Sequence, residues 1–141
     1  MSLRFHLPEQ RKLVHESVIS VRWGDMDAMG HVNNTVYFRY FEMSRMDWLR
    51  SACPDYAAEG CGPVIVNAFC NFLRQVEYPA ELLARHYVAH AGRSSIDTFI
   101  TLERLDEPGV IQAEGGAKIV WMDFQQQKSV PLPPWLRALA V

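Results

Sequence analysis

The segment that most constrains the fold is Thr35–Ser51, TVYFRYFEMSRMDWLRS, which contains no glycine and no proline. Aromatic side chains crowd its start, at Tyr37, Phe38, Tyr40 and Phe41. In a helix with ~3.6 residues per turn these side chains point to several sides, so the helix must be mostly enclosed by the rest of the chain. Asn33, Asn34 and Thr35 are all suitable N-caps for it.

Alternating apolar and polar residues on either side of this segment predict the sheet that encloses the helix. One strand is expected over His15–Trp23 and another over Val64–Leu73, which Pro79 ends. The stretches LLARHYVAH and SIDTFITLERL flank the turn AGRS and predict a hairpin. The last strand is expected in VIQAEGGAKIVWM, with a bulge or a strong bend at Gly115–Gly116. The tail VPLPPWLRALAV is expected to form a short terminal helix or an extended lid.

The order of these elements, a strand, a long helix and four more strands, predicts an α+β fold. One long central helix would pack on a curved five-stranded antiparallel sheet. A single helix cannot cover both faces of such a sheet, and edge strands invite pairing. We therefore expect a dimer that joins two sheets edge to edge.

Length, composition and charge narrow the class of protein further. With 141 residues, of which 49% are hydrophobic, the chain fits a single domain over residues 1–141 with one substantial core. Its formal net charge of −2 gives no general attraction to nucleic acid or to anionic membranes. No stretch matches a signal peptide or a membrane span, so a soluble cytoplasmic protein is expected. Cys53, Cys61 and Cys70 show no CxxC spacing, which fits a reducing compartment.

The loop RWGDMDAMGHVNN, Arg22–Asn34, holds the candidate chemistry. The first turn of a helix leaves backbone N–H groups unpaired, and its dipole favours negative charge nearby. A carbonyl oxygen placed at the amide of Asn34 is therefore polarised, and the oxyanion formed by attack on that carbonyl is stabilised. A carboxylate at Asp27 can attack the carbonyl or deprotonate a water that does so. This pairing suits an activated acyl group such as a thioester, and Gly30 lets the backbone approach a ligand closely.

The same loop also has structural interpretations. Asp and Asn between a strand and a helix commonly form only Asx turns and caps. His31 can fix the loop through a hydrogen bond or act as an acid. Asp25, Asp27 and Gly30 match the spacing of an EF-hand calcium loop, but Met29 occupies a position that needs an oxygen ligand.

Other polar residues give weaker indications. Glu42 is a second candidate carboxylate on the predicted helix, and pairing with Arg39 or Arg45 at helical spacing is the simpler interpretation. His86 and His90 have the spacing of a zinc helix, but they lie in a strand pattern and lack the glutamate of HExxH. No metal site is therefore predicted.

Taken together, RWGDMDAMGHVNNTVYFRYFE resembles the hotdog-fold thioesterases of the 4-hydroxybenzoyl-CoA thioesterase type. The stretches FLRQVEYPAEL, GRSS, GGAKIVWMD and VPLPPWL extend the resemblance over residues 14–136. The resemblance implies a hotdog fold, a long helix wrapped by an antiparallel sheet, in a homodimer or homotetramer with active sites at the subunit interface. It also implies that coenzyme A enters as part of the substrate and that no other cofactor is needed.

The resemblance assigns roles to residues of the loop. Asp27 takes the place of the catalytic carboxylate, as nucleophile or general base, and the backbone N–H of Asn34 polarises the carbonyl. Some relatives have a histidine at the position of Asn34. Asparagine cannot shuttle a proton, so only the backbone role is carried over, and His31 is the candidate to replace that side chain.

Contacts to the substrate follow from the same resemblance. Four apolar side chains are candidates for the acyl pocket or for ordinary core packing: Tyr37, Phe41, Val64 and Val66. Candidates for contact with the coenzyme portion, or for a plain solvated turn, lie in the predicted hairpin: Arg93, Ser94 and Ser95. Arg74 is a weaker candidate of the same kind.

Three functions remain open from the sequence. The first is an acyl-CoA thioesterase that releases a carboxylic acid and free coenzyme A, with acyl carrier protein as the alternative carrier. The second is hydration or dehydration of an acyl thioester on the same fold. The third is a non-catalytic module that binds acyl thioesters.

Overall fold

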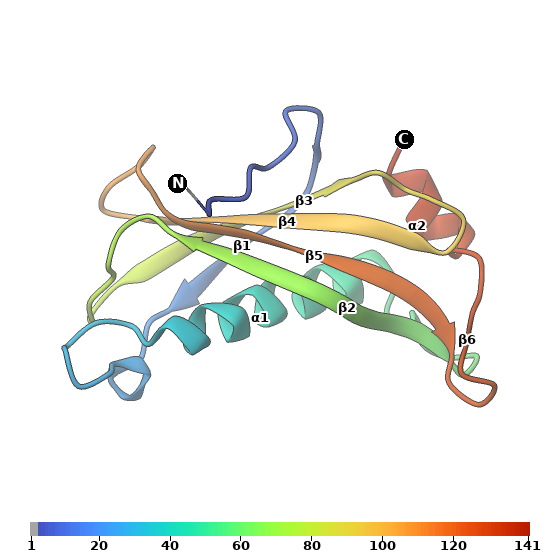
Figure 1. Ribbon diagram of the computed structural model, residues 1–141, viewed down its shortest axis with the longest axis horizontal. Helices are drawn as coiled ribbons and strands as arrows, with labels where there is room; N and C mark the ends of the chain where they lie inside the picture. The colour runs from blue at the N-terminus through green and yellow to red at the C-terminus, as the bar shows by residue number, and fades with distance from the viewer. Residues whose placement is uncertain (1–2) are drawn as a thin grey trace.

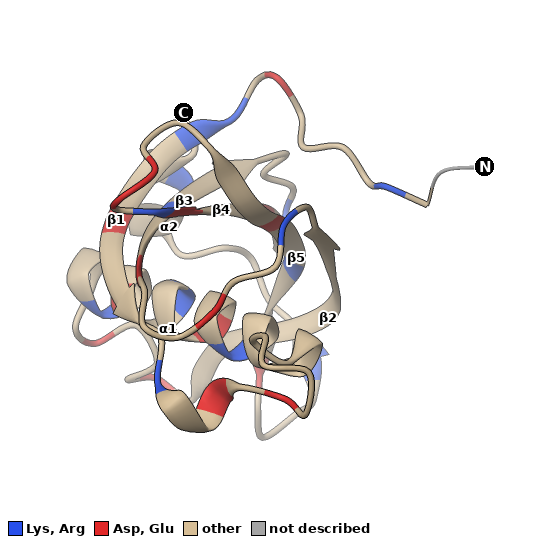
Figure 2. Ribbon diagram, turned by 90° about the vertical axis from the view of Figure 1, so that its left-hand side faces the viewer, with Lys and Arg blue, Asp and Glu red and all other residues tan. Residues whose placement is uncertain are grey.

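The computed structural model describes residues 3–141. One long helix, α1 (Asn34–Ala52), lies against the inner face of a curved antiparallel sheet (Figure 1; Figure 2). The strands are β1 (Lys12–Ser20), β2 (Cys61–Phe72), β3 (Glu81–Ala89), β4 (Ser95–Arg104), β5 (Ile111–Asp123) and β6 (Lys128–Ser129). Their spatial order is β1-β3-β4-β5-β2, and the short β6 pairs with β5. The α+β prediction is confirmed, with a sixth strand that the sequence did not predict.

The strand prediction is confirmed in the middle of the chain and corrected at its first strand. β3 and β4 form the predicted hairpin. β1 ends at Ser20, and Trp23–Asp25 forms a short 3-10 helix, η1, in place of the predicted continuation. The cause is local, because the Asp25 carboxylate accepts a hydrogen bond from the Arg22 amide at 2.9 Å and so favours a turn over an extended strand.

Of the two features predicted at the glycine pair of β5, a bulge or a strong bend, the bulge is absent. β5 pairs with β2 and β4 without a register shift at Gly115 or Gly116, and the shift in β2 falls at Val66. A Cβ at Gly115 would collide with the ring of Phe41 and with the backbone carbonyl of Phe69. The glycines therefore let α1 and the neighbouring strand approach β5 closely.

α1 buries one side against the sheet and leaves the other side open. The buried side chains belong to Tyr37, Tyr40, Phe41, Ser44, Trp48 and Leu49. Phe38 and Met43 remain 39% and 49% exposed, so the helix is less enclosed than its aromatic crowding predicts. α2 (Pro134–Leu139) closes the far end of the core, where Leu136 is fully buried with Trp48 and Leu49. The tail therefore forms a short helix, one of its two predicted conformations.

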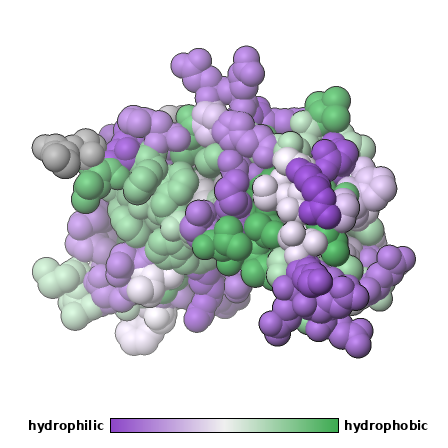
Figure 3. All heavy atoms as spheres, turned by 45° about the vertical axis from the view of Figure 1, so that its right-hand side comes forward, coloured by the Kyte–Doolittle hydropathy of each residue, from purple (hydrophilic) through white to green (hydrophobic). Residues whose placement is uncertain are grey.

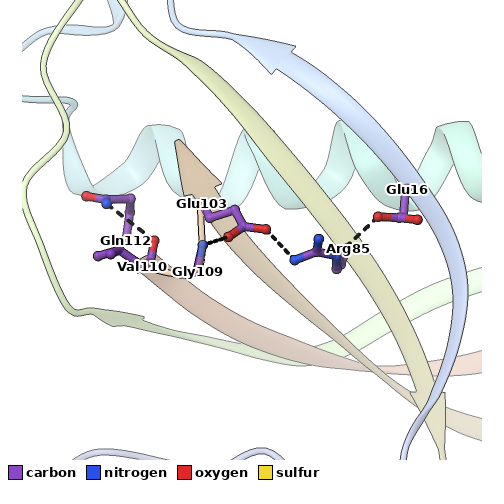
Figure 4. Close-up of polar contacts among 6 residues, drawn as sticks. All are labelled: Glu16, Arg85, Glu103, Gly109, Val110 and Gln112. Carbon is purple, nitrogen blue, oxygen red and sulfur yellow. Dashed lines mark hydrogen bonds and ion pairs between the residues drawn. The ribbon is translucent and has the colours of Figure 1, made fainter. Parts of the chain in front are cut away.

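A charged network ties three strands and a loop together (Figure 4). Arg85 of β3 donates a hydrogen bond to Glu16 of β1 at 3.1 Å and forms an ion pair with Glu103 of β4. Glu103 is only 4% exposed, and its second oxygen accepts a hydrogen bond from the Gly109 amide at 2.6 Å. A buried carboxylate needs such partners, so the network fixes β1, β3 and β4 relative to the β4–β5 loop.

The surface carries apolar residues at one edge of the sheet. β1 and β2 are the two edge strands, and exposed apolar side chains lie along or just after β2: Ile65, Val66, Phe72 and Leu73. Figure 3 shows apolar residues gathered in the middle of the visible face, between hydrophilic residues. Within residues 3–141 no helix combines the length and the apolar character needed to cross a bilayer.

Candidate active site

The loop between β1 and α1 folds back on itself before the helix begins. Met26 and Val32 form an isolated antiparallel bridge, and the Asp27 amide donates to the His31 carbonyl at 2.8 Å. Between them Gly30 has a φ of +80°, a left-handed conformation that favours glycine. This tight turn holds Asp27 close to the first turn of α1.

The two aspartates of the loop have different roles. Asp25 anchors the loop to the helix, because its Oδ2 accepts hydrogen bonds from the Arg22 amide at 2.9 Å and from the Tyr40 hydroxyl at 2.6 Å. Burial, together with the Asp25 carboxylate, raises the pKa of Tyr40, so this hydroxyl keeps its proton and donates. Asp25 is thus half-buried and held through its Oδ2, and it does not line the cavity described below, whereas Asp27 remains exposed.

The carboxylate of Asp27 is only partly used by the loop. Its Oδ1 accepts hydrogen bonds from the Met29 amide at 2.9 Å and from the His31 amide at 3.3 Å. Its Oδ2 has no hydrogen-bond partner within residues 3–141. Asp27 therefore makes the Asx turn expected of a purely structural residue and still offers one carboxylate oxygen to a ligand.

The start of α1 supplies an unpaired amide. Of the three N-caps that the sequence left open, Asn33 is the cap, and its side-chain oxygen accepts from the Thr35 amide at 2.9 Å. Asn34 is the first helical residue, and its N–H finds no acceptor in the described part of the chain. Such amides carry the positive end of the helix dipole, which favours an oxygen with negative charge.

Asp27 and Asn34 line one cavity of about 270 Å³. The other lining residues come from the loop, from α1 and from the end of β2 with the segment after it: Met29, His31, Val32, Tyr37, Phe72, Arg74 and Gln75. Tyr37 packs edge-on against Phe72 with 5.2 Å between ring centroids, and burial raises its pKa. The cavity thus has an aromatic wall opposite a carboxylate and a helix N-terminus.

His31 also faces this cavity. Its Nε2 lies 3.4 Å from a carboxylate oxygen of Glu77, which is two-thirds exposed. The backbone of His31 holds the loop through Asp27, so its imidazole is not needed for that purpose. His31 can therefore fix the loop through its backbone and still offer its imidazole as an acid, the two roles that the sequence left open.

The remaining predicted substrate contacts lie elsewhere in the chain. Gly30 shapes the loop without lining the cavity. Val64 pairs with Val120, which also pairs with Ser95, so Val64 and the hairpin residues 93–95 share one end of the sheet. Phe72 marks the opposite end of β2, about 26 Å away at the usual rise of a strand. One chain therefore does not bring Val64, Arg93, Ser94 or Ser95 to Asp27.

Sequence reasoning missed Phe72 and Gln75 and ranked Arg74 low. These residues reach the cavity because the Val32 amide donates to the Val76 carbonyl at 2.8 Å, which joins the loop to the segment after β2. That contact links residues far apart in the chain, so no local pattern predicts it. The only available signal was the stretch FLRQVEYPAEL, through its family resemblance.

Comparisons with known proteins identify the family and the fold. A family model described as the thioesterase-like superfamily matches residues 21–139, from the loop through α2. The solved structure of a candidate thioesterase from Pseudomonas aeruginosa, the PA2801 protein, is 37% identical with a TM-score of 0.86, covering 90% of this chain and 98% of that one. A candidate acyl-CoA thioesterase from Xanthomonas campestris is 33% identical with a TM-score of 0.71, covering 79% and 95%.

A curated plant protein is also similar. The chloroplastic acyl-acyl carrier protein thioesterase ATL3 of Arabidopsis thaliana is 29% identical over 129 residues, which span 88% of this chain and 66% of that relative's length. The long helix on its curved antiparallel sheet is the hotdog fold, as the sequence predicted. The chain belongs to the thioesterase-like superfamily.

Proposed function

We propose that the protein hydrolyses acyl thioesters, in the manner of the 4-hydroxybenzoyl-CoA thioesterase type, with Asp27 as the reactive carboxylate. The observation that carries the proposal is the shared cavity, which is lined by Asp27, with its unpaired Oδ2, and by Asn34, with its unpaired amide. Family membership supports thioester hydrolysis in general. The acyl group and its carrier are further parts of the proposal.

The proposed reaction begins with the thioester carbonyl oxygen at the Asn34 amide. This hydrogen bond draws electron density from the carbonyl carbon, and the helix dipole stabilises the oxyanion that follows. Asp27 either attacks the carbon or takes a proton from the water that attacks it.

Collapse of the tetrahedral intermediate breaks the carbon–sulfur bond. If Asp27 was the nucleophile, water then hydrolyses the mixed anhydride. The thiol that leaves has an ordinary pKa of ~8.5, so it departs without prior protonation more readily than an amine would. His31 is the candidate donor that returns a proton to the thiolate.

We propose coenzyme A as the carrier and acyl carrier protein as the alternative. The Xanthomonas campestris relative is named for acyl-CoA, and the Arabidopsis relative is named for acyl-acyl carrier protein. Arg74 gives the cavity a cation that suits the phosphates of either carrier.

We further propose that the active unit is a homodimer joined along β2. This edge is unpaired within the chain and exposes apolar side chains. Antiparallel pairing of two β2 strands about a two-fold axis places the Phe72 end of one strand beside the Val64 end of the other. The partner's hairpin residues 93–95, at the same end of the sheet as the partner's Val64, would then approach the cavity at Asp27.

A panel of acyl-CoA and acyl carrier protein thioesters, assayed with a thiol reagent, tests the proposed function. Hydrolysis releases one free thiol for each carboxylic acid formed. A hydratase or dehydratase converts the acyl chain and releases no thiol, and a binding module shows saturable binding without turnover. Either of these two results would overturn hydrolysis as the function.

A further inference from the structure

The N-terminal segment, residues 3–11, crosses the face of the sheet that points away from α1, from the β1 side toward β2 (Figure 2). Successive residues of a strand point to opposite faces of the sheet. A Cβ at Gly115 would meet the ring of Phe41 on α1, whereas a Cβ at Gly116 would meet the ring of Phe69. Phe69 therefore lies on this outer face, which is the face that the N-terminal segment covers.

Where it leads into β1, the N-terminal segment is fastened to β3. The guanidinium of Arg11 lies over the ring of Tyr87, 4.7 Å from its centroid, and its Nη1 donates a hydrogen bond to the Pro8 carbonyl at 2.8 Å. Tyr87 shares a cross-strand row with Phe99 and Gly116, so it also belongs to the outer face. This cation–π contact holds the base of the segment on the sheet.

Three contacts fasten the beginning of the segment over β2 and β5. The Phe5 amide donates to the Asn71 side-chain oxygen at 3.2 Å, and the Phe5 carbonyl accepts from the Asn71 side-chain nitrogen at 2.5 Å. The Phe5 ring packs on Phe69 with 5.3 Å between ring centroids. Arg4 forms an ion pair with Glu114 at 2.5 Å. Asn71 and Glu114 are cross-strand partners, 8% and 7% exposed, so the segment is anchored on buried groups of the sheet.

The fastened segment still leaves large apolar side chains in solvent. Leu3 is 82% exposed and Phe5 is 61% exposed. The strand beneath them, β2, is an edge strand and exposes apolar side chains of its own, such as Val66. Fixing a chain segment costs conformational entropy, and its contacts must offset that cost. An apolar surface that is held rigidly beside an open strand edge is therefore suited to contact with a second molecule.

A second copy of the chain fits this surface. The dimer proposed above joins two β2 strands, so the outer faces of the two sheets become continuous across the seam between them. Phe69 and Asn71 belong to β2 itself, so the N-terminal segment that they hold borders this seam. A two-fold axis brings the same segment of the partner to the other side of the seam.

We propose that the N-terminal segments of the two copies form an outer layer of the dimer interface. Leu3 and Phe5 of each copy pack there against β2 and the N-terminal segment of the partner. The inference rests on the proposed dimer and is independent of hydrolysis at Asp27. The N-terminal segment precedes residue 21, where the match to the family model begins, so that match does not cover this contact.

Photochemical cross-linking of the full-length protein tests the contact directly. With Phe5→benzoylphenylalanine, irradiation should join two chains covalently, and peptide mapping should place the cross-link on the partner's β2 or N-terminal segment. The matched control is Leu13→benzoylphenylalanine, since Leu13 is 45% exposed on the other edge strand, β1. This control should give no cross-linked dimer. Cross-links from position 5 that stay within one chain would overturn the proposal.

Sedimentation equilibrium measures what the contact contributes to the dimer. Phe5→Ser should raise the Kd of the dimer about 10- to 100-fold, the usual effect of removing a buried aromatic side chain from an interface. Leu3→Ser should also raise the Kd and should leave the urea midpoint of the monomer unchanged, because Leu3 is so exposed within one chain. Leu13→Ser should change neither quantity.

The result also separates this inference from the proposed dimer. If Val66→Glu on β2 dissociates the dimer while Leu3→Ser and Phe5→Ser leave its Kd unchanged, the dimer stands and the outer layer is overturned. A wild-type protein that stays monomeric at every concentration would overturn both. Neither result bears on thioester hydrolysis, which the release of free thiol measures.

Discussion

Asp27 lines the cavity and uses only one of its two carboxylate oxygens to hold the loop. Oδ1 holds the Asx turn with Met29 and His31, and Oδ2 remains available. The structural and the chemical interpretations of this residue are therefore compatible, although from the sequence they look like alternatives. Asp25, two positions earlier, is half-buried, is held by Arg22 and Tyr40 through its Oδ2, and does not line this cavity.

At the scale of one residue, His86 makes the free energy of unfolding depend on pH. It is fully buried on β3, stacked on Trp48 with ring centroids 4.8 Å apart, and its Nε2 has no hydrogen-bond partner in the described chain. Burial, with smaller contributions from Arg45 and His15, lowers its pKa to about 3. In the unfolded chain the same group takes up a proton near pH ~6.5.

At pH values between these two pKa values, His86 therefore binds more protons in the unfolded state than in the folded state. The free energy of unfolding should fall as pH drops from ~6.5 toward 3, by up to ~1.4 kcal/mol per pH unit from this group. Urea denaturation of wild type and His86→Gln across this range measures the difference, and the exposed His6→Gln serves as control. Parallel pH profiles for wild type and His86→Gln would contradict this account.

At the scale of elements, the alternation of apolar and polar residues predicted the strands well where no turn or bulge interrupts it. The β3–β4 hairpin has a clear turn and unbroken alternation, and it appears as expected. The end of β1 was missed because Asp25 forms a turn, and the alternation expected over Val64–Leu73 is interrupted by the register shift at Val66. The two residues of β6 are too few to show any period.

The glycine pair of β5 leads to a prediction at this scale. Gly115→Ala should lower the free energy of unfolding by ~1–3 kcal/mol, because its Cβ would overlap the Phe41 ring and a backbone carbonyl that cannot move away. Gly24→Ala is the matched control, since nothing lies within 4 Å of a Cβ at that position. Equal urea midpoints for the two variants would show that β5 and α1 are not packed this closely.

At the scale of the whole molecule, one chain brings together only some of the site residues that the sequence predicts. The sequence predicted Asp27 and Asn34, which share a cavity, because one short loop carries both. It did not predict Phe72 and Gln75, since tertiary pairing places them there. The hairpin residues 93–95 lie at the other end of the sheet, and the proposed dimer would bring those of the partner near.

The two edge strands offer a matched test of the proposed dimer. Val66 on β2 and Val18 on β1 are both 54% exposed. Val66→Glu should dissociate the dimer, because it places like charges across the two-fold axis, and thioesterase activity should fall with it. Val18→Glu should leave both unchanged. Sedimentation velocity decides the matter, and a dimer that survives Val66→Glu but not Val18→Glu would assign the interface to β1.

We propose above all that the Asp27 carboxylate performs the hydrolysis from beside the helix N-terminus. Asp27→Asn retains an oxygen for the Asx turn, so the protein should fold with nearly unchanged stability. Its kcat for thioester hydrolysis should fall by ~10²–10⁴, the usual loss for a positioned base, while the exposed Asp55→Asn keeps wild-type activity. A folded Asp27→Asn protein that hydrolyses its best thioester at the wild-type rate would contradict the account.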